Sequence, residues 1–510
     1  MDDAAELAAF RATQGRLRDP FGRNDIPQTL IVVPSITLDS AGLVKIPGVN
    51  HYEERLLFVL QRLRHPETRI VYVTSEAIAP EVVDYALSLV PSLPRENARR
   101  RLTMVDCASR EPIPLTAKLL ARPDLLDRIR GVIDAHSDAV LVAFNGSALE
   151  RTLAVRLGIP LYAADPDLAA LGSKTGSRRL FKDAGVPVAD GAEGLRDEGD
   201  VVAALAELRG RDATLAAAMI KLNDSFGAAG NVVFSFSGAP KTGLAEWIRK
   251  ELPERAVFGS PPDNWASYRD TLDSMGAVVE RFVEGIETTS PSAQVVISPE
   301  GVARVISTHD QVLAGPQQQI FVGATFPTRP DYRLQIQEQA LLAGRKLAER
   351  GVVGLVSIDF VAARGDQGWR HYGLEVNLRM GGGTAPWFLL HGLVDGEYDP
   401  VTAQYLAPDG APRAYFATDR LFRDAYRVLE PRHVIELLAR NGLQYRTSTR
   451  TGSAAYMLGA LEIGRFGAIV VDTDTAAATA EYQRLVAAVD AAAESRAQRR
   501  AAQVGVDTDG

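Results

Sequence analysis

Two neighbouring apolar stretches decide the fold: Gly354-Leu355-Val356-Ser357-Ile358-Asp359-Phe360-Val361 and His371-Tyr372-Gly373-Leu374-Glu375-Val376-Asn377-Leu378-Arg379. Both are rich in β-branched and aromatic residues, and the turn-forming segment 363–368 separates them. This pattern predicts an antiparallel β-hairpin. Because alternate residues of a strand share a face, Glu375 and Asn377 should point to one side, where Asp359 of the partner strand could meet them.

The polar side chains of this hairpin predict a magnesium-phosphate site. Asp359, Glu375 and Asn377 carry hard oxygen donors, which suit Mg²⁺, and this ion usually completes its coordination with waters and phosphates. Three glycines, 381–383, follow the second strand. Each acid alone is better explained as a polar residue at the end of a strand. The complete set of Asp, Glu-x-Asn-x-Arg and glycines favours the metal site.

The composition excludes several classes of protein. The chain has 510 residues, 46% of them hydrophobic, which predicts about three packed domains or subdomains. A net charge of -8 disfavours nucleic-acid binding. The first residues lack the basic region of an export signal, and no apolar run approaches a membrane-spanning length. The single cysteine, Cys107, excludes an intramolecular disulfide, and we expect a cytoplasmic protein.

Apolar runs alternate with helical patterns in the first third of the chain. The alternation predicts a parallel α/β layer with crossover helices. A small α+β unit follows, and longer strands after Gly276 predict an antiparallel sheet. We therefore expect an α/β fold divided into 1–168, 169–283, 284–475 and an Ala-rich helix with a frayed tail over 476–510.

The middle unit offers groups that could hold phosphate. Lys221 ends a strand, and the loop 223–230 behind it contains glycines that let the backbone approach an anion closely. The loop is not a Walker motif, because no Gly-Lys-Ser/Thr follows. Lys174 and Lys221 are each explicable as solvated lysines, and the loop as a plain turn, but their order relative to the later acids favours a nucleotide site.

Taken in order, these residues resemble the ATP-grasp superfamily. The resemblance covers about half of the chain and rests on Lys174, Lys221 with its loop, Glu280-Arg281-Phe282-Val283, Glu287, Asp359 and Glu375-Val376-Asn377. Over nearly the full length, Val33-Pro34-Ser35, His51-Tyr52-Glu53-Glu54-Arg55, Lys118 to Pro123 and Leu171 to Arg178 look like the pheganomycin peptide ligase family.

The resemblance implies an ATP-grasp fold with an N-terminal pre-ATP-grasp domain, a lid subdomain and a C-terminal subdomain that carries the metal site. The implied cofactors are ATP and Mg²⁺. The implied ligands of ATP are Lys174, Lys221, Ser225 and Gly227 for the phosphates, Glu280, Arg281, Phe282 and Val283 for adenine, and Glu287 for ribose. Asp359, Glu375 and Asn377 would hold Mg²⁺.

One position departs from the family pattern. Many D-alanine:D-alanine ligases have an arginine two residues before the first metal acid, and Ser357 stands there in this chain. The cation that steadies the transferring phosphate must therefore come from elsewhere. We predict that Arg379, two residues beyond Asn377 on the same strand face, acts with Lys221 in this role. The alternative is an arginine that only caps the sheet.

The implied reaction is ATP-dependent formation of an amide bond through an acyl phosphate, with release of ADP and phosphate. It needs no side-chain nucleophile, and the sequence shows no nucleophile elbow. The loop 223–230 is expected to cover the site. Polar segments between Ser307 and Pro327 are predicted to bind substrate, and His309 could deprotonate the attacking amine, although such a histidine more often only satisfies hydrogen bonds.

Two other functions stay open at this point. The same nucleotide site could phosphorylate a small molecule, or the protein could bind nucleotide as a regulator without turnover. For the leading interpretation, a ligase, the expected partners are amino-acid or peptide substrates, with neither nucleic acid nor membrane. A homodimer is compatible with the sequence.

Overall fold

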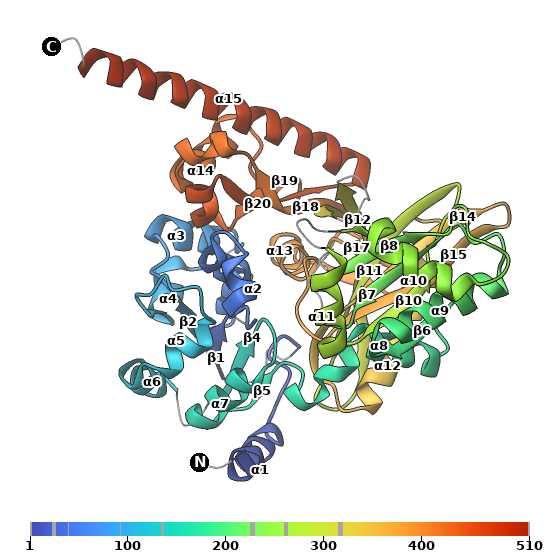
Figure 1. Cartoon of the computed structure of the whole chain (residues 1–510). Helices are drawn as coiled ribbons and strands as arrows, with labels where there is room; N and C mark the ends of the chain where they lie inside the picture. Colours follow the sequence, from blue (N-terminus) through green and yellow to red (C-terminus); the bar gives the residue numbers. More distant parts are fainter. Residues whose placement is uncertain are drawn as a thin grey trace.

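The computed structural model describes residues 3–22, 27–38, 40–91, 93–133, 137–224, 230–259, 264–314 and 320–507. Within these residues the strands form sheets of five, five and ten strands. The blue and cyan N-terminal sheet lies on the left of Figure 1, the second sheet lies on the right, and the third sheet extends from the right to the top centre, where β18, β19 and β20 lie. The fold is therefore α/β, as predicted. None of the helices in the described ranges is long and apolar enough to cross a bilayer.

The N-terminal sheet is entirely parallel, with the order β3-β2-β1-β4-β5. Alternate residues of β1 enter two separate cores, Leu30 and Val32 on one face and Ile31 and Val33 on the other. This two-sided burial explains why the run is continuously apolar. The strands are β1 Gln28–Val33, β2 Thr68–Thr74, β3 Leu102–Asp106, β4 Asp138–Ala143 and β5 Leu161–Tyr162. The helices are α1 Asp3–Gln14, α2 Ser40–Val44, η1 Val49–Arg64, α3 Pro80–Ser88, α4 Arg95–Arg100, α5 Leu115–Leu120, α6 Pro123–Arg130, α7 Ala148–Leu157 and η2 Pro166–Gly172.

The second sheet is antiparallel, with the order β6-β10-β7-β8-β9. Helices α9, α10 and α11 contribute to a core with the inward residues of this sheet, among them Ile220 and Val279. The strands are β6 Gly191–Leu195, β7 Ala217–Leu222, β8 Asn231–Ser235, β9 Val257–Phe258 and β10 Ala277–Arg281. The helices are α8 Lys174–Asp183, α9 Glu198–Arg211, α10 Leu244–Arg255 and α11 Trp265–Met275.

The large third sheet is antiparallel and begins with the predicted hairpin, in the order β15-β14-β11-β12-β13-β18-β17-β16, with β20 pairing both β18 and β19. Its strands are β11 Glu287–Ile297, β12 Ala303–Ala314, β13 Ile320–Phe326, β14 Gly354–Gly365, β15 Gly368–Asn377, β16 Glu397–Asp399, β17 Gln404–Leu406, β18 Pro412–Phe422, β19 Gly452–Tyr456 and β20 Arg465–Asp472. Its helices are α12 Arg333–Glu349, α13 Thr384–Val394, η3 Asp424–Val428, α14 Pro431–Arg440, η4 Leu458–Ile463 and α15 Thr475–Asp507.

Two C-terminal segments differ from the expectation. The sequence pattern predicts a glycine-rich turn at Gly452 and a helix through Tyr456 to Leu461, but the residues from Gly452 form β19, which pairs with β20, and the short helix η4 begins only at Leu458. Pairing with a buried neighbour strand satisfies the backbone better than an isolated turn would. A frayed tail was expected after about Ala493, but α15 continues to Asp507 and extends past the rest of the molecule (Figure 1).

Candidate active site

The hairpin of β14 and β15 brings the three predicted metal ligands together. Asp359 lies directly opposite Glu375, and Ser357 lies opposite Asn377. The Nδ2 atom of Asn377 donates a hydrogen bond to Oδ2 of Asp359 at 2.9 Å. Gln311 on β12 donates from Nε2 to the other oxygen of Asp359 at 3.1 Å. Two carboxylates and an amide therefore share one face of the sheet.

The electrostatics of this group fit a hard cation. Burial and the neighbouring charge of Glu375 raise the pKa of Asp359 to about 7. Burial also opposes ionisation of Glu375, but Lys174 and then Arg379 outweigh it and lower the pKa of Glu375. The negative charge of Glu375 thus opposes the ionisation of Asp359. A divalent ion bound between the two carboxylates would relieve the repulsion between them.

The donor set by itself is incomplete as a metal cage. In the described ranges, no group of three or more His, Cys, Asp or Glu side chains is arranged to hold a metal. The hairpin supplies two carboxylates and the amide of Asn377, so further ligands would come from phosphate oxygens and water. This is the coordination that Mg²⁺ prefers in nucleotide sites.

Lys174, the first residue of α8, reaches the hairpin from the side. Its ammonium lies 2.5 Å from Oε2 of Glu375, and the residue is only 6% exposed. Asn223, which follows β7, holds the start of α8, since its carbonyl and side-chain oxygens accept from the backbone N–H groups of Lys174 and Thr175. The lysine is thus fixed between the second sheet, called the lid sheet below after the predicted lid subdomain, and the three candidate metal ligands.

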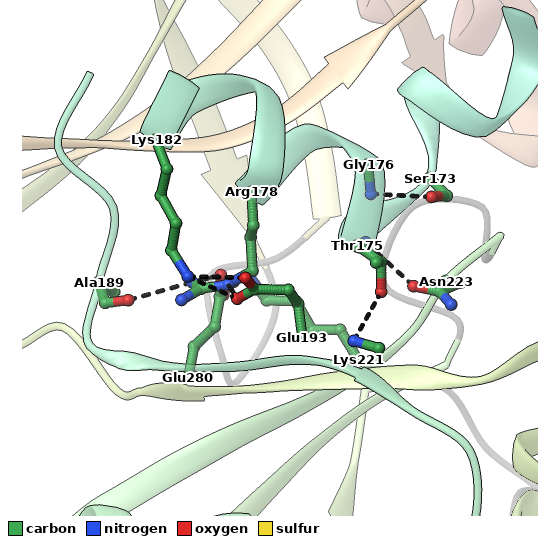
Figure 2. A network of polar contacts seen from close by, with 11 residues as sticks. Ser173, Thr175, Gly176, Arg178, Lys182, Ala189, Glu193, Lys221, Asn223 and Glu280 are labelled. Carbon is green, nitrogen blue, oxygen red and sulfur yellow. Dashed lines mark hydrogen bonds and ion pairs between the residues drawn. The ribbon is translucent and has the colours of Figure 1, made fainter. Parts of the chain in front are cut away.

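A buried ion-pair network around Glu280 includes Lys221, the second of the two lysines predicted to bind phosphate (Figure 2). Glu280 on β10 is 2% exposed and accepts from Lys221 Nζ and Arg178 Nη1, both at 2.6 Å. Arg178 is 1% exposed and also donates to the carbonyl of Ala189 and to Glu193. Burial opposes ionisation of Glu280, but the two cations outweigh it and lower its pKa.

Arg178 was not among the residues that the sequence predicted for the site. The signal was present in the spacing, because Lys174 and Arg178 are four residues apart and so share one face of α8. Ser177 on the same helix accepts a hydrogen bond at 2.9 Å from the backbone N–H of Val376. Helix α8 therefore connects the lid sheet to the metal hairpin.

The residues predicted for the nucleoside lie where the second sheet passes into the third. Strand β10 ends at Arg281, whose side chain donates to Asp212 at 2.6 Å and so points away from the hairpin residues. Phe282 and Val283 are half-buried in the link to β11. Glu287 begins β11 and forms ion pairs with Arg329 and Arg364, with which a ribose hydroxyl would have to compete.

Arg379 lies beside the metal candidates. Its Nη2 donates to Oδ1 of Asn377 at 3.0 Å, and burial lowers its pKa. Ser357, which stands at the position of the family arginine, accepts from Gln294 at 2.9 Å, and a Cβ at Gly381 would lie 2.9 Å from its own Cβ. The absence of a side chain at Gly381 therefore makes room for Ser357.

His309 occupies an environment that supports the structural alternative. The ring is fully buried, its Nε2 lies 2.5 Å from the hydroxyl oxygen of Tyr415, and Phe326 packs against it. Burial lowers the pKa of His309 to about 3, so the ring stays neutral at pH 7.

Ser225 and Gly227, together with the segment 315–319 of the predicted substrate region, lie outside the described residues.

A cavity of about 860 Å³ lies apart from these residues, between η1, β12, α12 and α13. Aromatic side chains, including Phe58, Trp387 and Tyr398, line it together with arginines such as Arg62 and Arg304. Within the portion of the chain that the structure describes, none of the residues that the sequence predicted for the site lines this cavity.

Comparison with known proteins supports one family. A family model described as "IQCH-like, ATP-grasp" matches residues 244–380. The chain is 33% identical over 455 residues to L-propargylglycine–L-glutamate ligase of Streptantibioticus cattleyicolor, covering 86% of this chain and 89% of the relative. It is 21% identical to IQ motif-containing protein H of Danio rerio, over 66% of this chain and 36% of that protein.

Solved structures show the same arrangement of sheets at low identity. Biotin carboxylase of Campylobacter jejuni has a TM-score of 0.52 and 12% identity, covering 90% of both chains. N5-carboxyaminoimidazole ribonucleotide synthetase in complex with ADP has a TM-score of 0.51 and 12% identity, covering 90% of this chain and 96% of that one. At such identities the likeness concerns the fold alone.

Proposed function

The chain belongs to the ATP-grasp ligases, enzymes that use ATP to form an amide bond between a carboxylate and an amine, and we propose that both of its substrates are amino acids. The name of the Streptantibioticus relative specifies two amino acids, which supports the proposal. The observation that carries it is the convergence of Asp359, Glu375 and Asn377 with Lys174 and Arg379 on one sheet face.

The predicted roles are carried forward as part of this proposal. Asp359, Glu375 and Asn377 hold Mg²⁺, and Lys174 and Lys221 hold the phosphates of ATP. The link from Glu280 to Glu287 holds the nucleoside. The domain division at 168, 283 and 475 belongs to the same proposal. The first two boundaries lie between successive sheets, and the third lies where α15 begins.

Within this site the chain's own residues supply charge and position. Bound Mg²⁺ and ATP would together provide an activated phosphoryl group whose negative charge is partly neutralised. Lys174, buried and paired with Glu375, would offer its ammonium to a phosphate oxygen of bound ATP. Arg379 points its guanidinium at the same region and, with Lys221, can steady the phosphoryl group during its transfer.

The side-chain carboxylate of Glu280 contributes by holding Lys221 and Arg178. Its buried carboxylate fixes the ammonium of Lys221 at 2.6 Å, so this cation is positioned before nucleotide arrives. Preorganisation of this kind lowers the free-energy cost of binding and of the reaction step. The acyl phosphate formed on the acid substrate is then attacked by the amine, which yields the amide and phosphate.

The test is an ADP-release screen with amino-acid pairs and short peptides, with mass spectrometry of the products. We expect ADP to appear only when acid and amine are both present, and the product mass to equal their sum less water. Asp359→Asn is the control and should abolish release. A stable phosphorylated product formed without an amine would favour the kinase, and nucleotide binding without ADP release would favour the regulator.

A further inference from the structure

Three arginines lie in a row that starts at the metal hairpin and leads away from it. Arg379 and Arg55 both lie over the ring of Phe144, with their guanidinium carbons 6.0 and 5.7 Å from its centroid. Arg55 also lies 4.3 Å from the centroid of Tyr52, and Arg465 lies 4.8 Å from the same ring. Two aromatic rings are thus each shared by two of the three arginines.

The three arginines come from distant parts of the chain. Arg55 is on η1 of the N-terminal unit, Arg379 follows β15, and Arg465 begins β20. Backbone hydrogen bonds connect Phe144 to the end of the hairpin, because the N–H of Met380 donates to the carbonyl of Phe144 at 3.1 Å and Asn145 pairs with Arg379 in a β-bridge. The row is therefore built by the tertiary fold around the candidate active site.

One acid, Asp419 of β18, is shared by Arg55 and Arg465, the two arginines of the row other than Arg379, which are called the outer arginines below. Arg55 Nη2 donates to its Oδ2, while Arg465 donates from Nε to its backbone oxygen at 2.7 Å and from Nη2 to Oδ1 at 3.4 Å. Burial opposes ionisation of Asp419, but Arg55 and Arg465 outweigh it and hold its pKa below the usual value. One carboxylate therefore faces two permanent cations.

The hydrogen-bonding capacity of the two outer guanidinium groups is far from exhausted. Each guanidinium has five N–H donors. Within the described residues, one donor of Arg55 and two of Arg465 are bonded to protein acceptors. Both side chains keep some contact with solvent, at 16% and 14% exposure. Stacking on an aromatic ring leaves the edge of a guanidinium able to donate in its plane.

From this geometry we propose that Arg55 and Arg465 form a subsite for a second carboxylate of the acid substrate, which is therefore a dicarboxylic amino acid such as L-glutamate. This inference rests on the proposed ligase function. One carboxylate of the substrate lies beside Arg379, where it is phosphorylated, and the other pairs with the outer arginines beyond Phe144. Planar, forked donors suit a carboxylate better than a neutral amide, which cannot form a charge-assisted pair.

The test compares variants of the full-length protein in ADP-release kinetics with L-glutamate, L-aspartate and L-glutamine as acid substrates. Arg55→Gln and Arg465→Gln should raise KM for the preferred dicarboxylate by about tenfold or more, since a charge-assisted hydrogen bond is lost. KM for ATP should stay the same. Arg55→Lys should recover part of the loss, because it restores charge without the fork.

Asp419→Asn separates a substrate subsite from a merely structural ion pair. A subsite predicts a lower KM for the dicarboxylate, because the competing carboxylate loses its charge. A structural pair predicts a lower melting temperature with KM unchanged, and that result would overturn the inference. Equal KM values of Arg55→Gln and the parent protein would overturn it as well.

The inference and the proposed function fail in different ways. If the parent protein releases ADP equally well with dicarboxylic and monocarboxylic amino acids, the subsite is refuted while the ligase function stands. If it releases no ADP with any pair, the ligase function fails. Calorimetric titration of L-glutamate into the parent protein and Arg55→Gln then decides on the subsite, which requires binding that is weakened in the variant.

Discussion

Replacing Glu280 with glutamine tests the buried network that holds the lid sheet to α8. The substitution keeps the size of the side chain but removes the negative charge that Arg178 and Lys221 share, both 2.6 Å away. Because Glu280 and Arg178 are 2% and 1% exposed, water cannot replace the lost anion. Breaking one partner of a buried ion pair typically costs about 3–5 kcal/mol, and we expect a loss of this size in the free energy of unfolding.

The functional consequence should accompany the loss of stability. Without Glu280, the ammonium of Lys221 is no longer fixed, so KM for ATP should rise. Urea denaturation can be followed by the fluorescence of Trp247 and Trp265, which belong to this unit, with Trp265 buried in its core. Hydrogen exchange of β7 and β10 should show that the loss is local to the lid sheet.

Glu193→Gln is the matched control for this experiment. Glu193 contacts the same arginine at 3.2 Å, but its other partner, Lys182, is 46% exposed. Partly exposed pairs contribute up to about 1 kcal/mol, so the control should lose far less stability and keep its KM for ATP. Equal losses in the two variants, or a loss below about 1 kcal/mol for Glu280→Gln, would refute the reasoning from burial.

Three further results are expected. Asp359→Asn should weaken Mg²⁺-dependent stabilisation by ATP in thermal-shift titrations, and an unchanged Mg²⁺ dependence would contradict the metal assignment. Arg379→Gln should lower kcat by about 10²- to 10³-fold, as loss of one charge-stabilising donor does, with a normal melting temperature as the check on folding. Burial raises the pKa of Glu54 from 4.5 to about 7, so its contribution to stability is complete below pH 4.5 and is lost as pH rises through about 7. Glu54→Gln should therefore flatten the decline of the unfolding free energy over this range in urea denaturation, and parallel curves for the variant and the parent protein would argue against it.

The local sequence determined the parts of the site that follow from periodicity. The two-residue periodicity of side chains in β14 and β15 was enough to put Asp359, Glu375 and Asn377 on one face, because alternate side chains of a pleated strand point to the same side. The parallel N-terminal layer was likewise predicted from its continuous apolar runs. The resemblance to ATP-grasp ligases depended on the order of motifs along the chain, which is a property of sequence alone.

Only the tertiary structure decided which charges meet. Arg178 reaches Glu280 across 102 positions, and Arg55 reaches Asp419 across 364. The local pattern places Arg178 on the same helix face as Lys174, but it does not reveal that Arg178 or Arg55 is paired with an acid, since their partners come from distant elements. The burial of His309 is decided in the same way, by the packing of Phe326 and Tyr415 around it. Periodicity is a local property of the backbone, whereas desolvation and pairing depend on which elements pack together in three dimensions.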